Sequence, residues 1–239
     1  MRDSQRGQSL LGNLLLAAGV AFAGWAVADG LLKFKTADRY VSVKGLAERE
    51  VPADLVVWPI GYMEAGNDLG AIYQLSQAHA QQIAGFLKSQ GLEKAEQSLS
   101  TPKITDNQAE SYGDRSHPAN RYKAEVTYTV RSSDVAAVKK AMAASGELVK
   151  SGVAFMSYGN PPEFRYTKLN DLKPELLAEA TKNARRAAEQ FASDSASLVG
   201  SIRSANQGQI TIEDRDTGTP EIKRVRVVTT IDYELKTTQ

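Results

Sequence analysis

The hydrophobic and polar positions after residue 38 follow two different periods, which predict strands and amphipathic helices. Residues 122–131 alternate apolar and polar side chains one by one, as expected of a strand with one buried face. Residues 67–90 instead space their apolar side chains by three and four, which predicts an amphipathic helix capped by Asn67 or Asp68 and ended by Gly91. Its predicted inner positions are Leu69, Ile72, Tyr73, Ala80, Ile83, Phe86 and Leu87.

Shorter apolar runs and turn residues predict the remaining elements. Strands are expected at 40–47, from 55 to 58, and at 98–105, 153–158, 201–213 and 222–235. Pro59 lacks an N–H, so its strand is expected to bulge or to lie at a sheet edge there. A short helix capped by Ser132 or Ser133 is expected to end at Gly146.

A long helix is predicted from about residue 170 to 198, with Pro174 in its first turn. Small side chains dominate its predicted inner face and would let it lie close against a sheet: Leu177, Ala180, Ala184, Ala187, Ala188 and Phe191. From residue 55 to 158 the order is strand, helix, strand, strand, helix, strand, which is that of the ferredoxin-like βαββαβ motif. We therefore expect residues 39–239 to form one α+β domain of mainly antiparallel sheet.

The amino-terminal segment is predicted to reach a membrane. Residues 7–28 carry no charge, and a helix of that length spans about 30 Å of hydrocarbon. Ala26-Val27-Ala28 would also suit cleavage of a secretory signal, but the apolar run is longer than a usual signal core, and Trp25 suits a membrane interface. We favour a tail at 1–9 followed by a single anchor, or uncleaved signal, at 10–32.

The charges around this segment leave its orientation open. Arg2 and Arg6 precede it, and Lys33, Lys35 and Arg39 follow it, so the positive-inside rule does not decide between the two orientations. We choose an inner-membrane protein whose carboxyl-terminal domain lies in the periplasm or outside the cell. Small residues such as Gly12, Gly19 and Ala23 either let anchors pack together or reflect the ordinary composition of membrane helices.

Composition removes several classes of function. The formal net charge is +1, which disfavours a protein built to hold nucleic acid, and the absence of cysteine excludes thiol nucleophiles, thiolate zinc sites and iron–sulfur clusters. Of the two histidines, His79 is predicted at the border of its helix's apolar face and His117 in a polar loop, which does not favour a metal site. No catalytic motif is found, and we expect neither cofactor nor metal.

Three groups of residues remain as candidate sites. Glu48, Glu50 and Asp54 offer paired carboxylates for acid–base chemistry, although a solvated turn in which Asp54 binds its own backbone fits them better. A basic strip would join Arg203 with Lys223, Arg224 and Arg226, although neighbouring acids favour an ordinary solvated strand face. The polar loop 106–120, with Tyr112, Arg115 and His117, is either a partner-binding loop or a variable tip.

Three stretches of the chain form a recognisable combination. They are residues 41–54, with Gly45 and the turn Pro52-Ala53-Asp54; the strand 122–126 continuing to Asp134-Val135; and the alanines at 180, 184, 187 and 188 followed by Leu198-Val199-Gly200. Together they resemble the SIMPL-domain family of bacterial envelope proteins. Asp194-Ser195-Ala196-Ser197 departs from the family by being more polar.

The resemblance implies a secreted, periplasmic or membrane-anchored protein that forms large oligomers, some relatives being described as oxidative-stress defence proteins. It brings no catalytic residues. The sequence thus favours a non-enzymatic, anchored envelope protein whose exported domain self-assembles or binds an unidentified envelope partner. The alternative is a carboxylate- or metal-dependent hydrolase or redox-protective enzyme, which would place Glu48, Asp54 or His79 in a concave pocket.

Overall fold

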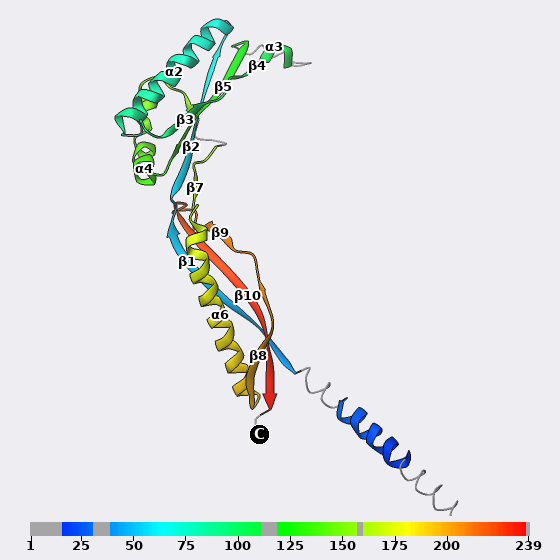
Figure 1. The fold of residues 1–239 in the computed structure, drawn as a ribbon. Coiled ribbons are helices and arrows are strands. Elements are labelled where there is room, and N and C mark those ends of the chain that lie inside the picture. The colour runs from blue at the N-terminus through cyan, green and yellow to red at the C-terminus, as the bar shows by residue number, and fades with distance from the viewer. Residues whose placement is uncertain (1–15, 31–38, 111–118, 157–159, 238–239) are drawn as a thin grey trace, which may run out of the picture. The chain divides into compact units, whose positions relative to one another are not determined.

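The computed structural model describes residues 16–30, 39–110, 119–156 and 160–237 of the chain (Figure 1). It confirms an α+β protein with antiparallel sheets and one long helix. The chain forms two compact units: unit 1 is Met1–Ala47, Glu175–Ile210 and Arg226–Gln239, and unit 2 is Glu48–Pro174 and Thr211–Val225. No boundary is visible in the sequence because a strand at each end and the long helix all run from one unit into the other.

Unit 2 contains the predicted strand–helix–strand–strand–helix–strand order, with additions. In chain order the elements are β2 (Leu55–Gly66), α2 (Leu69–Ser89), β3 (Glu96–Leu99), β4 (Lys103–Asp106), α3 (Asn107–Glu110), β5 (Tyr122–Ser132), α4 (Val135–Ala143), α5 (Gly146–Lys150), β6 (Phe155–Met156) and β7 (Glu163–Arg165). The described strands pair antiparallel in the order β3-β5-β2-β6, with β4 on β5 and β7 on β2. Helices α2 and α4 cover one face of this sheet (Figure 1).

The centre of unit 2 is the long antiparallel pair of β2 and β5. Their register runs without a shift from Val56 opposite Ser132 to Gly66 opposite Tyr122. The predicted alternation holds in β5, where Ala124, Val126, Tyr128 and Val130 are buried. Pro59 lies opposite Thr129, and in the described residues neither β7 nor β6 pairs with it on the other side. Its missing N–H therefore falls at a local edge, and the strand does not bulge.

Helix α2 begins and ends as predicted. The Asp68 side chain accepts a hydrogen bond from the Ala71 N–H at 2.9 Å, and Gly91 takes a positive φ of 80° beyond the last turn. Its inner face is shifted from the predicted one, because Leu69 and Tyr73 are exposed. Two polar residues take part in that face instead; the buried set is Ile72, Ser76, His79, Ala80, Ile83, Phe86 and Leu87.

The connections after β5 differ in detail from the prediction. Asp134, and neither predicted serine, caps α4 by accepting from the Ala137 N–H at 2.9 Å. Gly146 does not stop the helical region, because α5 begins there. The expected strand at 98–105 is divided into β3 and β4, both paired with β5.

Unit 1 is a sheet covered on one face by a helix. The chain enters it through β1 (Tyr40–Pro52) and returns through α6 (Leu169–Asp194), β8 (Ser197–Gln207) and β10 (Ile222–Thr237), while β9 (Thr211–Asp214) belongs to unit 2. The strand order is β1-β10-β8, with β9 also on β10. Alanines at every fourth position of α6 are buried, and a Cβ on Gly45 of β1 would lie 1.8 Å from the Ala180 carbonyl oxygen. Helix and strand thus meet backbone to backbone, as the small residues predict.

Helix α6 ends earlier than the predicted residue 198. The helix ends at Asp194, and Ala196 turns the chain into β8 with a positive φ of 52°. Phe191, a predicted inner residue, is 60% exposed, and Ala192 takes the buried position. Leu177 is likewise only half-buried, because Leu176 faces the sheet. The polar stretch Asp194–Ser197 therefore comprises the last residue of α6, the turn and the first residue of β8.

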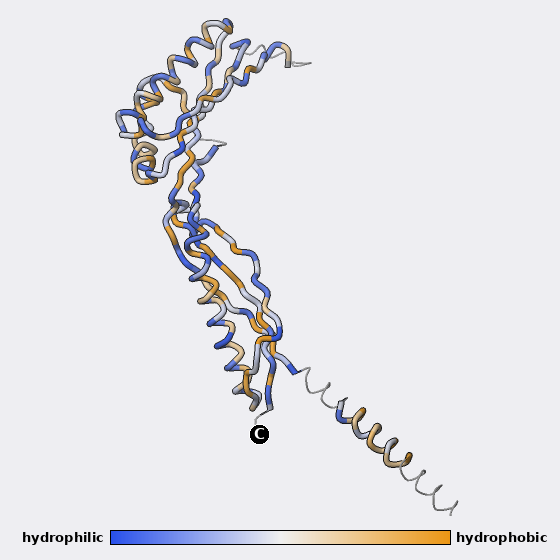
Figure 2. Tube along the Cα trace, in the orientation of Figure 1, coloured by the Kyte–Doolittle hydropathy of each residue, from blue (hydrophilic) through white to orange (hydrophobic). Residues whose placement is uncertain are grey.

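Residues 16–30 are helical and mostly apolar, as Figure 2 shows. Within the described part of the chain, none of the helices combines the length and the apolar character needed to cross a membrane.

Candidate functional site

A buried polar cluster joins β2 to α2 inside unit 2. His79 Nδ1 lies 2.5 Å from Glu64 Oε1, and their side chains are only 10% and 7% exposed. One turn earlier on the helix, the Ser76 carbonyl accepts a hydrogen bond from the Tyr62 hydroxyl at 3.0 Å. Glu64 and Tyr62 project from the same face of β2, because they are two residues apart. His79 is therefore a core residue, and its predicted place at the border of the apolar face is wrong.

The surroundings of this cluster are nonpolar enough to change its chemistry. Burial raises the pKa of Tyr62, so its phenol keeps its proton and remains a donor. Its ring meets the His79 ring edge-on, with the centroids 6.3 Å apart. Within the described residues, the buried Ser76 hydroxyl has no hydrogen-bond partner. A histidine held by a carboxylate is a common general base, but here burial keeps both groups from a dissolved substrate. The arrangement acts as a polar cross-link between strand and helix.

The partner-loop residues Tyr112, Arg115 and His117 lie outside the described residues. The structure describes the base of the loop 106–120, whose first residues form the short helix α3. Arg121 makes two short bonds to the Asp106 carboxylate, and this guanidinium lowers the pKa of that group. The Asn107 amide donates to the Asn120 carbonyl at 2.9 Å, and Asn67 accepts from the Arg121 N–H at 2.8 Å. Both ends of the loop are thus fixed to the sheet and to the start of α2.

The predicted carboxylate group is divided among separate structural roles. Asp54 does not bind its own turn; it accepts from the Thr167 N–H at 2.8 Å and from the Thr167 hydroxyl at 3.1 Å. Glu50 instead faces Arg215, at 3.5 Å. The two carboxylates therefore hold different loops. In the part of the chain that the structure describes, no three His, Asp or Glu residues are grouped to hold a metal ion.

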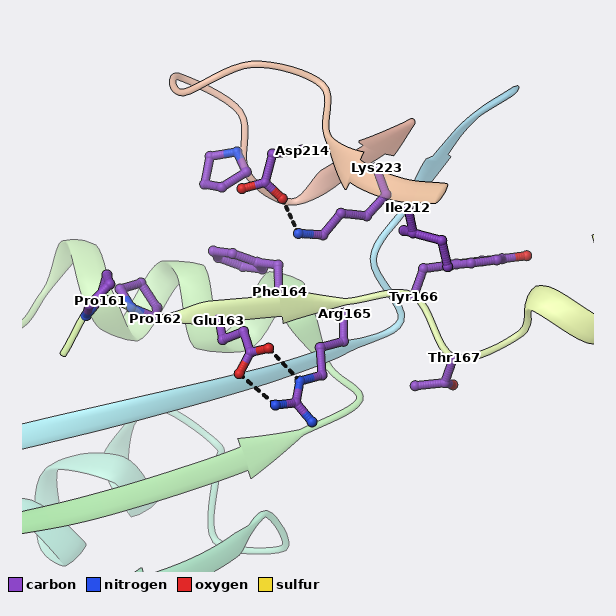
Figure 3. A pocket seen from close by; sticks show the side chains of 11 residues that line it. Pro161, Pro162, Glu163, Phe164, Arg165, Tyr166, Thr167, Ile212, Asp214 and Lys223 are labelled. Carbon is purple, nitrogen blue, oxygen red and sulfur yellow. Dashed lines mark hydrogen bonds and ion pairs between the residues drawn. The ribbon is translucent and has the colours of Figure 1, made fainter. Parts of the chain in front are cut away.

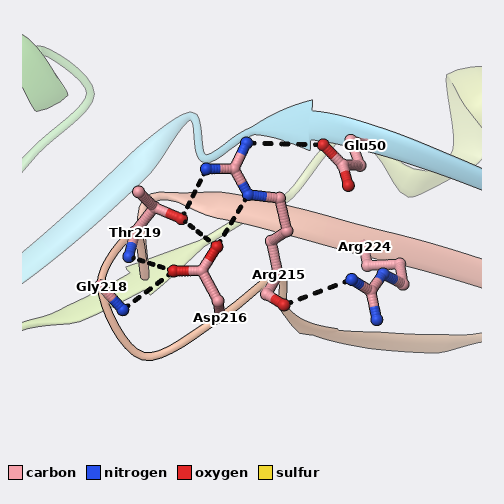
Figure 4. A network of polar contacts seen from close by, with 6 residues as sticks. All are labelled: Glu50, Arg215, Asp216, Gly218, Thr219 and Arg224. Atoms are coloured by element: carbon pink, nitrogen blue, oxygen red, sulfur yellow. Dashed lines mark hydrogen bonds and ion pairs between the residues drawn. The ribbon is translucent and has the colours of Figure 1, made fainter.

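A polar network closes the turn between β9 and β10 (Figure 4). The Asp216 carboxylate accepts from the N–H groups of Gly218 and Thr219, from the Thr219 hydroxyl and from Arg215. These bonds, the Thr219 hydroxyl foremost, lower the pKa of Asp216 to about 2. This turn was not among the predicted sites, although Asp-Thr-Gly-Thr is the kind of sequence in which an Asp side chain caps a turn.

A hollow of about 510 Å³ lies beside β7 in unit 2 (Figure 3). Its apolar lining includes Pro161, Pro162, Phe164 and Ile212. Two cations also line it, and each is paired: Lys223 with Asp214, and Arg165 with Glu163 at 2.6 Å. Because both charges are already balanced, the hollow offers mainly an apolar surface.

The predicted basic strip is not formed in unit 2. Lys223 is 7% exposed on the inner face of β10, whereas Arg224 lies on the other face and donates to the Arg215 carbonyl at 3.3 Å. Neighbouring residues of a strand point to opposite faces, so these two cations do not act together. In unit 1 the Arg203 guanidinium lies 5.0 Å from the centre of the Tyr40 ring.

The stretches on which the family resemblance rests now have structural places. Residues 41–54 are β1 and the turn to β2, residues 122–135 are β5 and the cap of α4, and the spaced alanines are the buried face of α6. A family model described as "SIMPL: Protein of unknown function (DUF541)" matches residues 41–231. The chain belongs to the SIMPL family. Among curated proteins none matches the chain. The SIMPL match thus covers both units and leaves the function to be argued from the structure.

Proposed function

We propose that the protein is a non-enzymatic, membrane-anchored envelope protein whose exported domain assembles with further copies of itself through β8. The observation that carries the proposal is the exposure of this strand. From Ser201 to Gln207 every residue of β8 is exposed. Among the described strands, β8 pairs only with β10, so its other edge is open to pairing with a further strand.

The composition of β8 supports pairing with another strand. Its sequence contains one charged residue, Arg203, and no proline. The strand at the opposite side of the sheet, β1, carries Lys44, Glu48, Arg49 and Glu50 and ends in Pro52. Charges and proline protect sheet edges from unwanted pairing. The β1 edge has this protection and the β8 edge does not.

An antiparallel pair of two β8 strands has a preferred register. If the pair is centred on Ile202, Arg203 lies opposite Ser201 of the other copy, and like charges do not face each other. A centre at Arg203 would place the two guanidinium groups directly opposite, which is unfavourable. The apolar Ile202, 51% exposed, then meets its own equivalent across the interface.

Anchoring rests on the amino-terminal segment. Residues 7–28 carry no charge, residues 16–30 are helical, and basic residues stand on both sides. We propose a single span at 10–32 in the inner membrane, with residues 39–239 in the periplasm. The proposal predicts that the full chain stays in membranes washed with alkaline carbonate, whereas release into the wash would contradict it.

Assembly through β8 is tested with a single cysteine, because the chain has none of its own. In the proposed register two Ile202→Cys residues lie directly opposite, within the Cα separation of about 4.4–6.8 Å that a disulfide spans. The full chain in detergent should form a covalent dimer on oxidation, and Leu46→Cys on β1, 41% exposed, should not. In the reduced protein, Ile202→Lys should lower the assembled mass and Leu46→Lys should not. A monomeric mass at all concentrations, with no cross-link at position 202, would refute the proposal.

A further inference from the structure

One end of unit 1 gathers the start of β1, the end of α6, the start of β8 and the end of β10. Arg39 joins three of these elements. Its carbonyl accepts from the Leu235 N–H at 2.9 Å, and its guanidinium donates to the hydroxyls of Thr237 at 3.2 Å and Ser197 at 3.5 Å. We call this region the Arg39 end.

Two large apolar side chains are exposed at the Arg39 end. Phe191, in the last turn of α6, is 60% exposed, and Leu198, at the start of β8, is 55% exposed. Leu198 also lines a hollow of about 590 Å³ together with Ala192 and Val199. The core is complete without these two residues, because Ala188 and Ala192 already fill the inner face of the helix. The exposure of Phe191 and Leu198 therefore indicates that they contact a surface outside the domain.

The length of the chain before β1 indicates which surface this is. If residues 10–32 span the bilayer, only residues 33–39 separate the span from Tyr40. Seven residues extend to about 25 Å at most. Because β1 starts at the Arg39 end, that end is held within this distance of the membrane, on the same side as the exported domain.

The charged residues near the Arg39 end suit contact with an anionic lipid surface. Residues 33–39 contain three basic residues, Lys33, Lys35 and Arg39, against one acid, Asp38, and a segment with net positive charge is attracted to anionic headgroups. Two acids flank Phe191 on its helix, but both are already bonded: Glu189 to Arg185 at 3.0 Å and Asp194 to Gln190 at 2.9 Å. A phenylalanine and a leucine beside basic residues are typical of segments that enter the interfacial region of a bilayer.

We infer that the Arg39 end of unit 1 rests on the lipid bilayer, with Phe191 and Leu198 inserted among the headgroups. This inference rests on the proposed anchor. It gives the exported domain a second contact with the membrane and fixes the orientation of unit 1 above it. In the proposed antiparallel pair of β8 strands the two Arg39 ends lie at opposite ends of the pair. Both ends reach the same bilayer when β8 lies along the membrane plane, with its exposed edge at residues 201–207 turned sideways toward the second copy.

The test places an environment-sensitive fluorophore on single cysteines of the full chain in phosphatidylethanolamine–phosphatidylglycerol vesicles. Phe191→Cys and Leu198→Cys probe the contact, and Tyr73→Cys and Ile104→Cys, which are 55% and 52% exposed in unit 2, are the matched controls. Lipids with a quencher near the headgroup should quench the first pair at least about two-fold more than the second, since an inserted side chain reaches about 5–10 Å into the interface. A label at Ser195 should lose this quenching in the Phe191→Ser, Leu198→Ser variant and keep it in Leu75→Ser.

A label on Val20→Cys separates the two proposals. Quenching at position 20 by lipids labelled deep in the acyl chains, with positions 191 and 198 quenched no more than the controls, would overturn the contact and leave the anchor standing. Absence of quenching at position 20 would refute the anchor, and the contact with it. Far-UV circular dichroism checks that each labelled variant is folded.

Discussion

His79 on α2 and Glu64 on β2 meet in the interior of unit 2, with the imidazole Nδ1 2.5 Å from the carboxylate Oε1. Replacing His79 by alanine leaves this carboxylate buried without its partner. Because a buried charged group without its partner is strongly destabilising, we expect the free energy of unfolding to fall by about 3 kcal/mol or more. Urea unfolding followed by Trp58 fluorescence measures it.

The control for His79→Ala is an exposed pair. Arg185 and Glu189 lie four residues apart on α6, with side chains 63% and 55% exposed. Arg185→Ala should cost about 0.5 kcal/mol or less, because solvent screens such pairs. Equal losses in the two variants would contradict the structural role given to Glu64 and His79.

Gly45→Ala tests the contact between β1 and α6. Its Cβ would fall 1.8 Å from the Ala180 carbonyl oxygen, so backbone must move, at a cost of about 3 kcal/mol. Gly85→Ala in α2 is the matched change, since no atom lies within 4 Å of its added Cβ. It should raise stability by about 0.5–1 kcal/mol. Thermal unfolding of both variants checks the opposite signs.

The turn closed by Asp216 should respond to acid. The folded pKa of about 2 lies below the ordinary value of 3.8, so ionised Asp216 stabilises the turn above pH 3.8. This contribution is lost as the pH falls through about 2. The amide resonances of Gly218 and Thr219 should titrate in this range. Thr219→Val removes the hydroxyl that contributes most and should move their midpoint upward, and an unchanged midpoint would contradict the assignment.

Tyr62 should make the protein sensitive to alkali. Burial raises its pKa above 10.0, so the neutral phenol stabilises the fold fully below pH 10. That stabilisation is lost as the pH rises through the folded pKa. Tyr62→Phe should cost about 1 kcal/mol at pH 7 and reduce the further loss above pH 10. Tyr73→Phe, at an exposed position, should change neither, which stability curves at several pH values would show.

Periodicity predicted the elements whose side chains alternate clearly between core and solvent. The alternation in β5 and the three–four spacing in α2 follow directly from one buried face. The same rule placed Phe191 inside, because size and spacing favour it. The buried alanines at 180, 184 and 188 instead set a four-residue spacing that continues at Ala192, so Phe191 falls on the exposed side.

The sites were harder to predict because their residues come together only through pairing across the fold. Glu64 lies 15 positions before His79, and nothing local marks them as partners. Lys223 was predicted at the surface because it stands in a basic run, yet the alternation of β10 turns it inward to Asp214. Whether such a polar side chain is buried, and with which partner, depends on contacts between residues far apart in the chain. The local pattern of a single sequence does not reveal these contacts.

The alanines that face the sheet recur at positions 180, 184, 188 and 192, one turn of α6 apart. A helix with this repeat presents nearly the same surface after sliding along the sheet by a full turn. Asn183 removes the ambiguity, because its side-chain amide donates to the Leu46 carbonyl at 2.8 Å. A single exposed amide therefore selects one alignment of helix and strand among several that the apolar surfaces would accept.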